Sequence, residues 1–202
     1  MKKIFLFVVA AFAMLFTSCQ NCGNTPEPEQ KDDAVVITSD DWKDIIAKVW
    51  PAVNSQYPDY AFYEAEGKVK KLDEVWGVDR NTFRAAFGNP FKIASVIAYI
   101  QNDTLKFYQV DEPWCEDIYM TPFVPCDLTM AIETLQKTID IAPEGSPAVL
   151  RHQLFPNELE PRWFIGSIAE CHTVNVYSLI VDQPLKDFDG LQVEHTGFAA
   201  KK

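Results

Sequence analysis

Basic residues are scarce in this 202-residue sequence, in which 18 lysines and arginines stand against 29 aspartates and glutamates, a formal net charge of −11. Proteins that bind nucleic acids need a basic surface that displaces counterions from the phosphates. The sequence contains no such basic stretch. This composition argues against nucleic-acid partners and, for the same reason, against docking on anionic lipid headgroups.

Recognisable catalytic motifs are lacking as well. The sequence has no Gly-rich phosphate loop, no serine nucleophile elbow and no dinucleotide-binding fingerprint. Its three histidines, His152, His172 and His195, are far apart and show no metal-ligand spacing. Cys171 precedes His172, but adjacent residues of a strand point to opposite faces, so a nucleophile and base pair is not expected. We therefore expect no enzyme, no metal and no cofactor.

No apolar run reaches the roughly 20 residues that a membrane-spanning helix needs. The longest run, residues 4–16, follows two lysines and ends shortly before Cys19. A charged start, a short apolar core and small residues at the end are typical of an export signal. Residues 1–18 are therefore predicted to be a signal peptide.

The segment Leu15-Phe16-Thr17-Ser18-Cys19 resembles the lipobox of bacterial lipoproteins, with Phe16 where leucine is usual. This resemblance implies that Cys19 receives diacylglycerol and becomes the new N-terminus, whereas an ordinary signal peptide cut nearby is the alternative. Two or more acyl chains anchor a protein stably, where a single chain is marginal. Because glutamine rather than aspartate follows Cys19, the usual sorting pattern implies the outer membrane of a cell envelope. Whether the domain faces the periplasm or the surface is left open.

Residues 19–38 are predicted to form a flexible, lipidated tether. Residues 20–33 include two prolines and no large apolar side chain, a composition that cannot form a core. When extended at up to about 3 Å per residue, such a segment holds the following domain tens of ångströms from the bilayer. The domain is therefore expected to face water.

Residues 39–200 are predicted to form one globular α+β domain, because the chain's hydrophobic content of 48% is enough for one ordinary core. Apolar spacing and cap residues predict three helices. The first is capped by Ser39 or Asp40 and ends or kinks at Pro51. The second covers residues 81–88 and the third residues 127–139.

Strands are predicted where β-branched and aromatic residues gather in short runs. After an aromatic, extended stretch at residues 57–67, residues 91–100 and 105–110 form a hairpin around an Asn102-Asp103 turn. Three further strands follow the last helix, at residues 148–155, 162–168 and 173–181. The order helix, strands, helix, strands favours an antiparallel sheet covered by helices.

A faint internal repeat accompanies this order, because residues 93–110 and 149–167 each read as a strand, an Asn-acid turn and an aromatic strand. The layout over residues 39–185 resembles the tandem repeats of PepSY-like domains and of the beta-lactamase inhibitory proteins. Those families are exported, small and non-enzymatic. The resemblance implies two sub-repeats, residues 39–113 and 126–185, and a binding or inhibitory module.

Two cysteines and a group of acids leave alternatives open. A disulfide between Cys115 and Cys126 would close a Pro-rich connector in an envelope location that permits disulfides, whereas two reduced thiols are the alternative. Four acids could surround a calcium ion but lack the alternating acid-Gly loop, so a solvated acidic loop is preferred. They are Asp111, Glu112, Glu116 and Asp117.

Three tryptophans, Trp76, Trp114 and Trp163, are candidate ligand contacts, because exposed indole rings stack on sugars and peptide side chains, although core packing is the alternative for each. The favoured function is a non-enzymatic, envelope-exposed binding module for a protein, peptide or glycan, which predicts an exposed apolar patch. The alternative is an envelope hydrolase whose site assembles only in the fold, which predicts a cleft with a strongly shifted acid or histidine. The oligomeric state is left open.

Overall fold

The computed structural model describes residues 34–89, 91–92, 94–114, 118–153, 160–167 and 170–182. They all belong to one compact unit, Ala34–Lys202. The predicted signal peptide, Cys19 and most of the predicted tether lie outside the described residues. In chain order the elements are α1 (Trp42–Gln56), β1 (Ala61–Lys71), β2 (Trp76–Gly88), β3 (Ser95–Gln101), β4 (Thr104–Val110), α2 (Leu128–Thr138), β5 (Pro147–Arg151), β6 (Arg162–Ser167), β7 (Glu170–Asn175) and β8 (Val181–Asp182).

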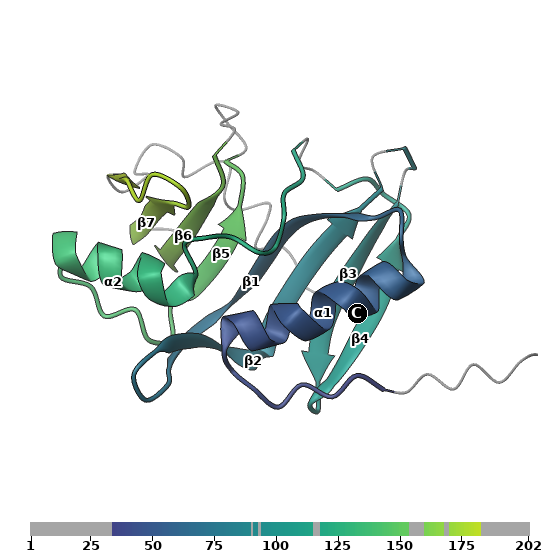
Figure 1. Ribbon diagram of the computed structural model, residues 1–202, viewed down its shortest axis with the longest axis horizontal. Helices are drawn as coiled ribbons and strands as arrows, with labels where there is room; N and C mark the ends of the chain where they lie inside the picture. The colour runs from purple at the N-terminus through teal and green to yellow at the C-terminus, as the bar shows by residue number, and fades with distance from the viewer. Residues whose placement is uncertain are drawn as a thin grey trace, which may run out of the picture. The chain divides into compact units, whose positions relative to one another are not determined.

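The strands of the described residues form one antiparallel sheet in the order β4-β3-β2-β1-β5-β6-β7-β8. Strands β1 and β5 are therefore neighbours at its centre. Helices α1 and α2 both lie on the same face of the sheet, α1 in front of β2 to β4 and α2 beside β5 to β7 (Figure 1). The predicted α+β fold with an antiparallel sheet packed by helices is confirmed. Within the described residues, neither helix is long and apolar enough to cross a membrane.

One row of directly paired residues crosses the whole sheet on the helix side. From β4 to β8 this row reads Phe107, Ala98, Ala85, Ala65, Leu150, Trp163, Val174 and Val181. Every side chain in it is apolar, and the apolar stripes of both helices pack with it into a single core cluster. Directly paired residues share a face, and the next residue along each strand points to the opposite face. The row therefore identifies the buried face of every strand.

The first helix begins one residue later than predicted. Asp41, not Ser39 or Asp40, is the N-cap, and its carboxylate accepts hydrogen bonds from the amides of Lys43 and Asp44 at 2.9 and 3.1 Å. Ser39 supports this cap, because its Oγ accepts from the Asp41 amide at 3.1 Å. The three polar residues in a row are all acceptable caps, so the sequence could not decide between them.

Helix α1 also continues through Pro51, where the sequence predicted an end or a kink. The missing amide proton of Pro51 leaves the carbonyl of Ala47 without its usual helical partner. Ala47 is exposed, so water can satisfy that carbonyl. Val53, two residues after Pro51, is buried in the core, which favours continuation of the helix.

The helix predicted for residues 81–88 is wrong, because those residues belong to strand β2. The prediction relied on Phe83 and Phe87 being four residues apart. A spacing of four is even, so it also fits the two-residue period of a strand. Ala85 lies between them on the same buried face, and pairing with both β1 and β3 selects the strand.

The other local predictions hold in most of their detail. The β3–β4 hairpin turns at Asn102 and Asp103, whose φ angles are +50° and +57°, as a two-residue turn of this kind requires. Helix α2 is capped by Asp127, which accepts from the Met130 amide at 2.9 Å. The strand predicted for residues 173–181 is instead split into β7 and β8. Glu160 holds the intervening turn by accepting from the amides of residues 177 and 178 at 2.7 and 2.6 Å.

The fold begins before residue 39, within the segment predicted to be tether. Ile37 is fully buried, and Val36 forms an antiparallel bridge with Thr104. The Leu105 amide donates to the carbonyl of Val35 at 2.9 Å. These last residues of the predicted tether extend the sheet at the edge of β4 and are not free linker.

Asp40 ties this N-terminal arm to the sheet. Its carboxylate accepts hydrogen bonds from Lys70 Nζ at 2.5 Å and from Arg80 Nη1 at 2.8 Å, and Arg80 Nε donates to Asp103 at 2.7 Å. Burial would raise the pKa of Asp40, but the hydrogen bonds from Lys70 and Arg80 outweigh it and hold the pKa below 3.8. The ionised carboxylate therefore contributes to stability.

Asp40→Asn is expected to lower the free energy of unfolding at pH 7 by about 2 kcal/mol, because charge-assisted hydrogen bonds to a partly buried carboxylate are lost. A carboxylate whose pKa is lowered in the folded state stabilises the fold above its unfolded pKa of 3.8, and the stabilisation disappears as pH falls through the folded pKa. Urea titrations over a series from pH 7 to below pH 3.8 should show the stability gap between wild type and variant narrowing as the pH falls. Asp59→Asn is the control, because Asp59 and its partner Lys92 are both exposed.

Candidate functional site

A second row of paired residues crosses the sheet on the face turned away from both helices, which we call the open face. From β4 to β8 it consists of Lys106, Tyr99, Arg84, Glu66, Val149, Phe164, Thr173 and Asp182. Each of these residues is next in sequence to a member of the apolar row. Within the described residues, neither helix lies on this face (Figure 1). The open face thus combines charged and aromatic side chains on rigid strands.

Glu66 lies at the centre of the open face. Burial raises the pKa of Glu66, and the charges of Arg84 and Arg151 lower it without cancelling the effect of burial. Arg151 is buried, and its guanidinium carbon lies 4.9 Å from the centroid of the Phe164 ring. This contact is a cation–π interaction that fixes the orientation of the arginine.

Two tyrosines form the accessible end of the open face. The rings of Tyr99 and Tyr108 contact each other edge to face, with centroids 5.8 Å apart. Burial raises the pKa of Tyr108, Arg84 opposes that shift, and Tyr99 and Glu66 add to it. Tyr108 is nevertheless 42% exposed. Tyrosine and arginine are the residue types most enriched at the centres of protein interfaces, so this end of the sheet has the chemistry of a binding surface.

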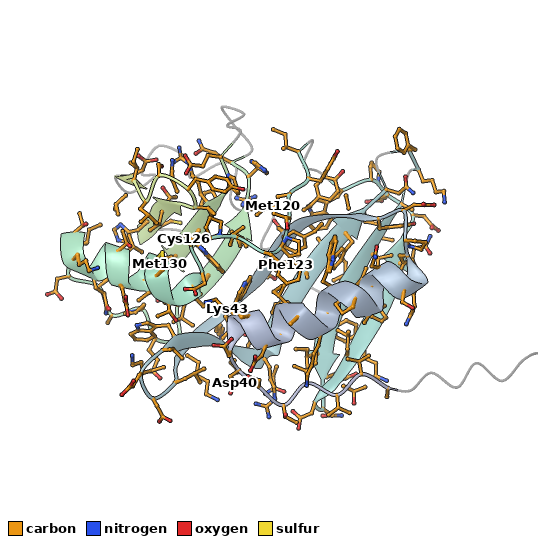
Figure 2. All side chains as sticks on the ribbon, in the orientation of Figure 1. Asp40, Lys43, Met120, Phe123, Cys126 and Met130 are labelled. Atoms are coloured by element: carbon orange, nitrogen blue, oxygen red, sulfur yellow. The ribbon has the colours of Figure 1, made fainter. Side chains whose placement is uncertain are left out.

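A cavity of about 240 Å³ lies on the helix side, between the facing starts of α1 and α2 and the start of β2. Trp76 and Met130 supply apolar walls, and Lys43, Asp127 and Glu133 supply charge. Figure 2 shows Lys43 at the start of α1 and Met130 at the start of α2. The cavity is held in shape by Thr129, whose Oγ1 accepts from the Trp76 amide at 2.9 Å and donates to the Trp76 carbonyl at 3.0 Å.

The structure does not bring the three candidate tryptophans together. Trp76 lines the cavity, and Lys71 Nζ lies 4.4 Å from the centroid of the Trp76 ring. Trp114 is half-buried beside Gly88 at one end of β2. Trp163 is fully buried, so it belongs to the core and the alternative interpretation holds for it.

Two of the three cysteines of the predicted domain lie within the described residues. Cys126 is a free, fully buried thiol, and burial raises its pKa to about 12. Cys115 lies outside the described residues, so the Cys115–Cys126 disulfide stays a prediction. Cys171, in β7, is also buried.

The histidines and the acidic loop occupy different places. His152 is buried and His172 half-buried, while His195 lies outside the described residues. Asp111 and Glu112 are exposed, whereas residues 116 and 117 of the predicted acidic cluster are outside the described part. Among the described residues, no three potential metal ligands gather. The sequence matches no known protein family, and no curated protein and no solved structure is similar to it.

Proposed function

We propose that this protein is a lipid-anchored envelope protein whose globular part is a non-enzymatic binding module for a protein, peptide or glycan. The ligand binds on the open face. The observation that carries this proposal is the row from Lys106 to Asp182. It lies on the face that neither described helix packs against, and its end on β2 to β4 keeps charged and aromatic side chains partly or fully accessible. A rigid scaffold lowers the entropy lost on binding, because the side chains are already ordered.

The accessible part of this surface is formed by Tyr99, Tyr108, Arg84 and Lys106. An interface of ordinary affinity depends on a few aromatic and arginine side chains at its centre. Stacking on the tyrosines and hydrogen bonding to Arg84 suit a flat ligand such as a peptide strand or a sugar ring. The buried stacking of Arg151 on Phe164 supports this centre from the side of β5 and β6.

The proposed anchor is the lipid on Cys19, added after removal of residues 1–18. Support comes from the resemblance of residues 15–19 to a lipobox and from the polar composition of the residues that follow. The proposed location is the cell envelope, at the outer membrane. An acidic domain on a polar tether would remain in water and present the open face to a ligand there.

We further propose that α1 to β4 and α2 to β8 are two copies of one helix-plus-four-strands unit, as in PepSY-like domains and the beta-lactamase inhibitory proteins. The sheet order supports this, because the first strands of the two units, β1 and β5, are neighbours and each unit continues outward. In such a repeat, β5 and β6 of the second unit are equivalent to β1 and β2 of the first unit. The sequence had aligned β5–β6 with β3–β4, which are not equivalent in this scheme.

Photo-crosslinking tests the open face directly. A benzophenone amino acid at Tyr108 of the full-length protein, displayed on its own cells, is expected to give a discrete crosslinked ligand. The same probe at Gln136 is the matched control, because Gln136 is also exposed but lies on α2, on the other side of the sheet and outside the lining of the cavity. Arg84→Ala should abolish the crosslink from position 108. Equal crosslinking from positions 108 and 136 would contradict the proposal.

The alternative function, an envelope hydrolase, has one observation in its favour. Glu66 is a half-buried acid with a raised pKa, which is typical of a general acid. If the protein hydrolyses envelope glycans or peptides, Glu66→Gln should abolish turnover while leaving ligand binding intact. If it only binds, purified protein incubated with cell-wall fragments should release no product.

A further inference from the structure

The cavity between α1 and α2 is small for a metabolite. Pockets for drug-sized ligands and cofactors usually measure about 300–1,000 Å³. At about 240 Å³ this cavity is large enough for one long side chain and too small for most cofactors. Its size points to a single protruding group of a partner.

Its walls suit a group that is apolar along its length and positively charged at its end. Val75 and Met130, exposed by 40% and 42%, supply apolar surface, and Trp76 supplies an aromatic wall. The carboxylates of Asp127 and Glu133 lie in the same lining. Lysine and arginine side chains pack their methylene stems on such surfaces while the charged head contacts carboxylates or an indole ring.

The protein already places two of its own lysines on these groups. Lys43 forms an ion pair with Asp127, and Lys71 Nζ lies 4.4 Å from the centroid of the Trp76 ring. The side chain of Lys43 is 71% exposed, so this ion pair contributes little to stability and can be displaced at small cost. The Lys43 ion pair shows that an ammonium group binds at the wall of the cavity, and the Lys71 contact shows that the Trp76 ring also accepts one.

One further observation agrees with a cationic occupant. The chain carries a formal charge of −11, which attracts basic partners over distance.

We propose that this cavity is a second binding site, which receives one lysine or arginine side chain of a basic partner protein. The aliphatic stem lies between Trp76 and Met130, and the charged head contacts Glu133 and Asp127 in place of Lys43. This site lies on the helix side, away from the open face. The proposal for the cavity and the proposal for the open face are therefore tested independently.

The test uses full-length protein labelled with 5-fluorotryptophan, whose five indole signals are resolved by ¹⁹F NMR, with the Trp76 signal assigned through Trp76→Phe. The probes are Nα-acetyl-arginine amide and Nα-acetyl-lysine amide. Their uncharged analogues, Nα-acetyl-citrulline amide and Nα-acetyl-norleucine amide, are the matched controls. The charged probes are expected to shift the Trp76 signal saturably in the millimolar range, and the uncharged analogues at least tenfold more weakly.

Two charge variants then separate the site from the overall charge of the protein. Lys43→Gln is expected to tighten binding about fivefold, because it frees Asp127 for the probe. Lys137→Gln changes the net charge equally, but Lys137 is in the last turn of α2 and should leave the affinity unchanged. Glu133→Gln should weaken binding about threefold or more. Equal affinities for arginine and citrulline, or equal effects of the Lys43 and Lys137 variants, would overturn the proposal.

Discussion

Gly77→Ala is expected to lower the free energy of unfolding by about 3 kcal/mol. A Cβ atom at Gly77 would lie 2.1 Å from the carbonyl oxygen of Asp40 and 2.7 Å from Leu72 Cδ1. That carbonyl accepts a hydrogen bond from the Val78 amide at 2.8 Å, so moving it away breaks the contact between the N-terminal arm and β2. Urea unfolding monitored by circular dichroism measures this loss of unfolding free energy.

Gly145→Ala is the matched control for this substitution. Gly145 has a φ angle of +76°, and a Cβ atom there would meet nothing within 4 Å. The unfolding free energy lost in Gly145→Ala should therefore be limited to the conformational cost of an alanine in the left-handed region, about 1 kcal/mol. If Gly77→Ala costs no more than Gly145→Ala, the close approach of Asp40 to β2 is not a tight contact in the folded protein.

The elements that sequence predicted best are those whose ends are decided locally. Asp127 begins α2, and Asn102 with Asp103 forms the β3–β4 turn, because a cap and a two-residue turn are chosen by the residues themselves. Strand β2 was missed because the spacing of Phe83 and Phe87 fits both helix and strand. Only pairing with neighbours far along the chain resolves such a segment, and that pairing is not visible in local sequence.

The candidate sites depend even more on distant pairing. The row on the open face joins residues from eight strands, and each neighbouring pair needs the correct register. A slip of one residue would exchange Arg84 on the open face for Ala85 on the buried face. The alternation of charged and apolar residues in β1 and β2 was a usable signal, but it could not show that Lys106, Arg84 and Glu66 lie in one line. The cavity likewise combines segments that are far apart in the sequence, from the starts of α1, β2 and α2.

Trp163→Ala is expected to cost about 4 kcal/mol of unfolding free energy, which is the usual range for removing a fully buried tryptophan. The indole nitrogen of Trp163 donates to the carbonyl of Cys126 at 2.7 Å, and its ring packs edge to face on Trp42 with centroids 4.7 Å apart. One side chain of β6 thus holds the segment before α2 and the start of α1. Its removal leaves a cavity and an unpaired carbonyl, so both helices lose support together.

Two further variants separate the contributions of Trp163. Trp163→Phe keeps an aromatic ring in the core but leaves the Cys126 carbonyl unpaired, and it should cost about 2 kcal/mol, part of the loss in the alanine variant. Tyr177→Ala removes an aromatic side chain that is 59% exposed and should change stability by no more than about 0.5 kcal/mol. Urea unfolding should show the largest loss for Trp163→Ala, a smaller one for Trp163→Phe and the smallest for Tyr177→Ala. If Trp163→Ala instead resembled Tyr177→Ala, the core would not depend on Trp163, and the helices would have to be held to the sheet by other contacts.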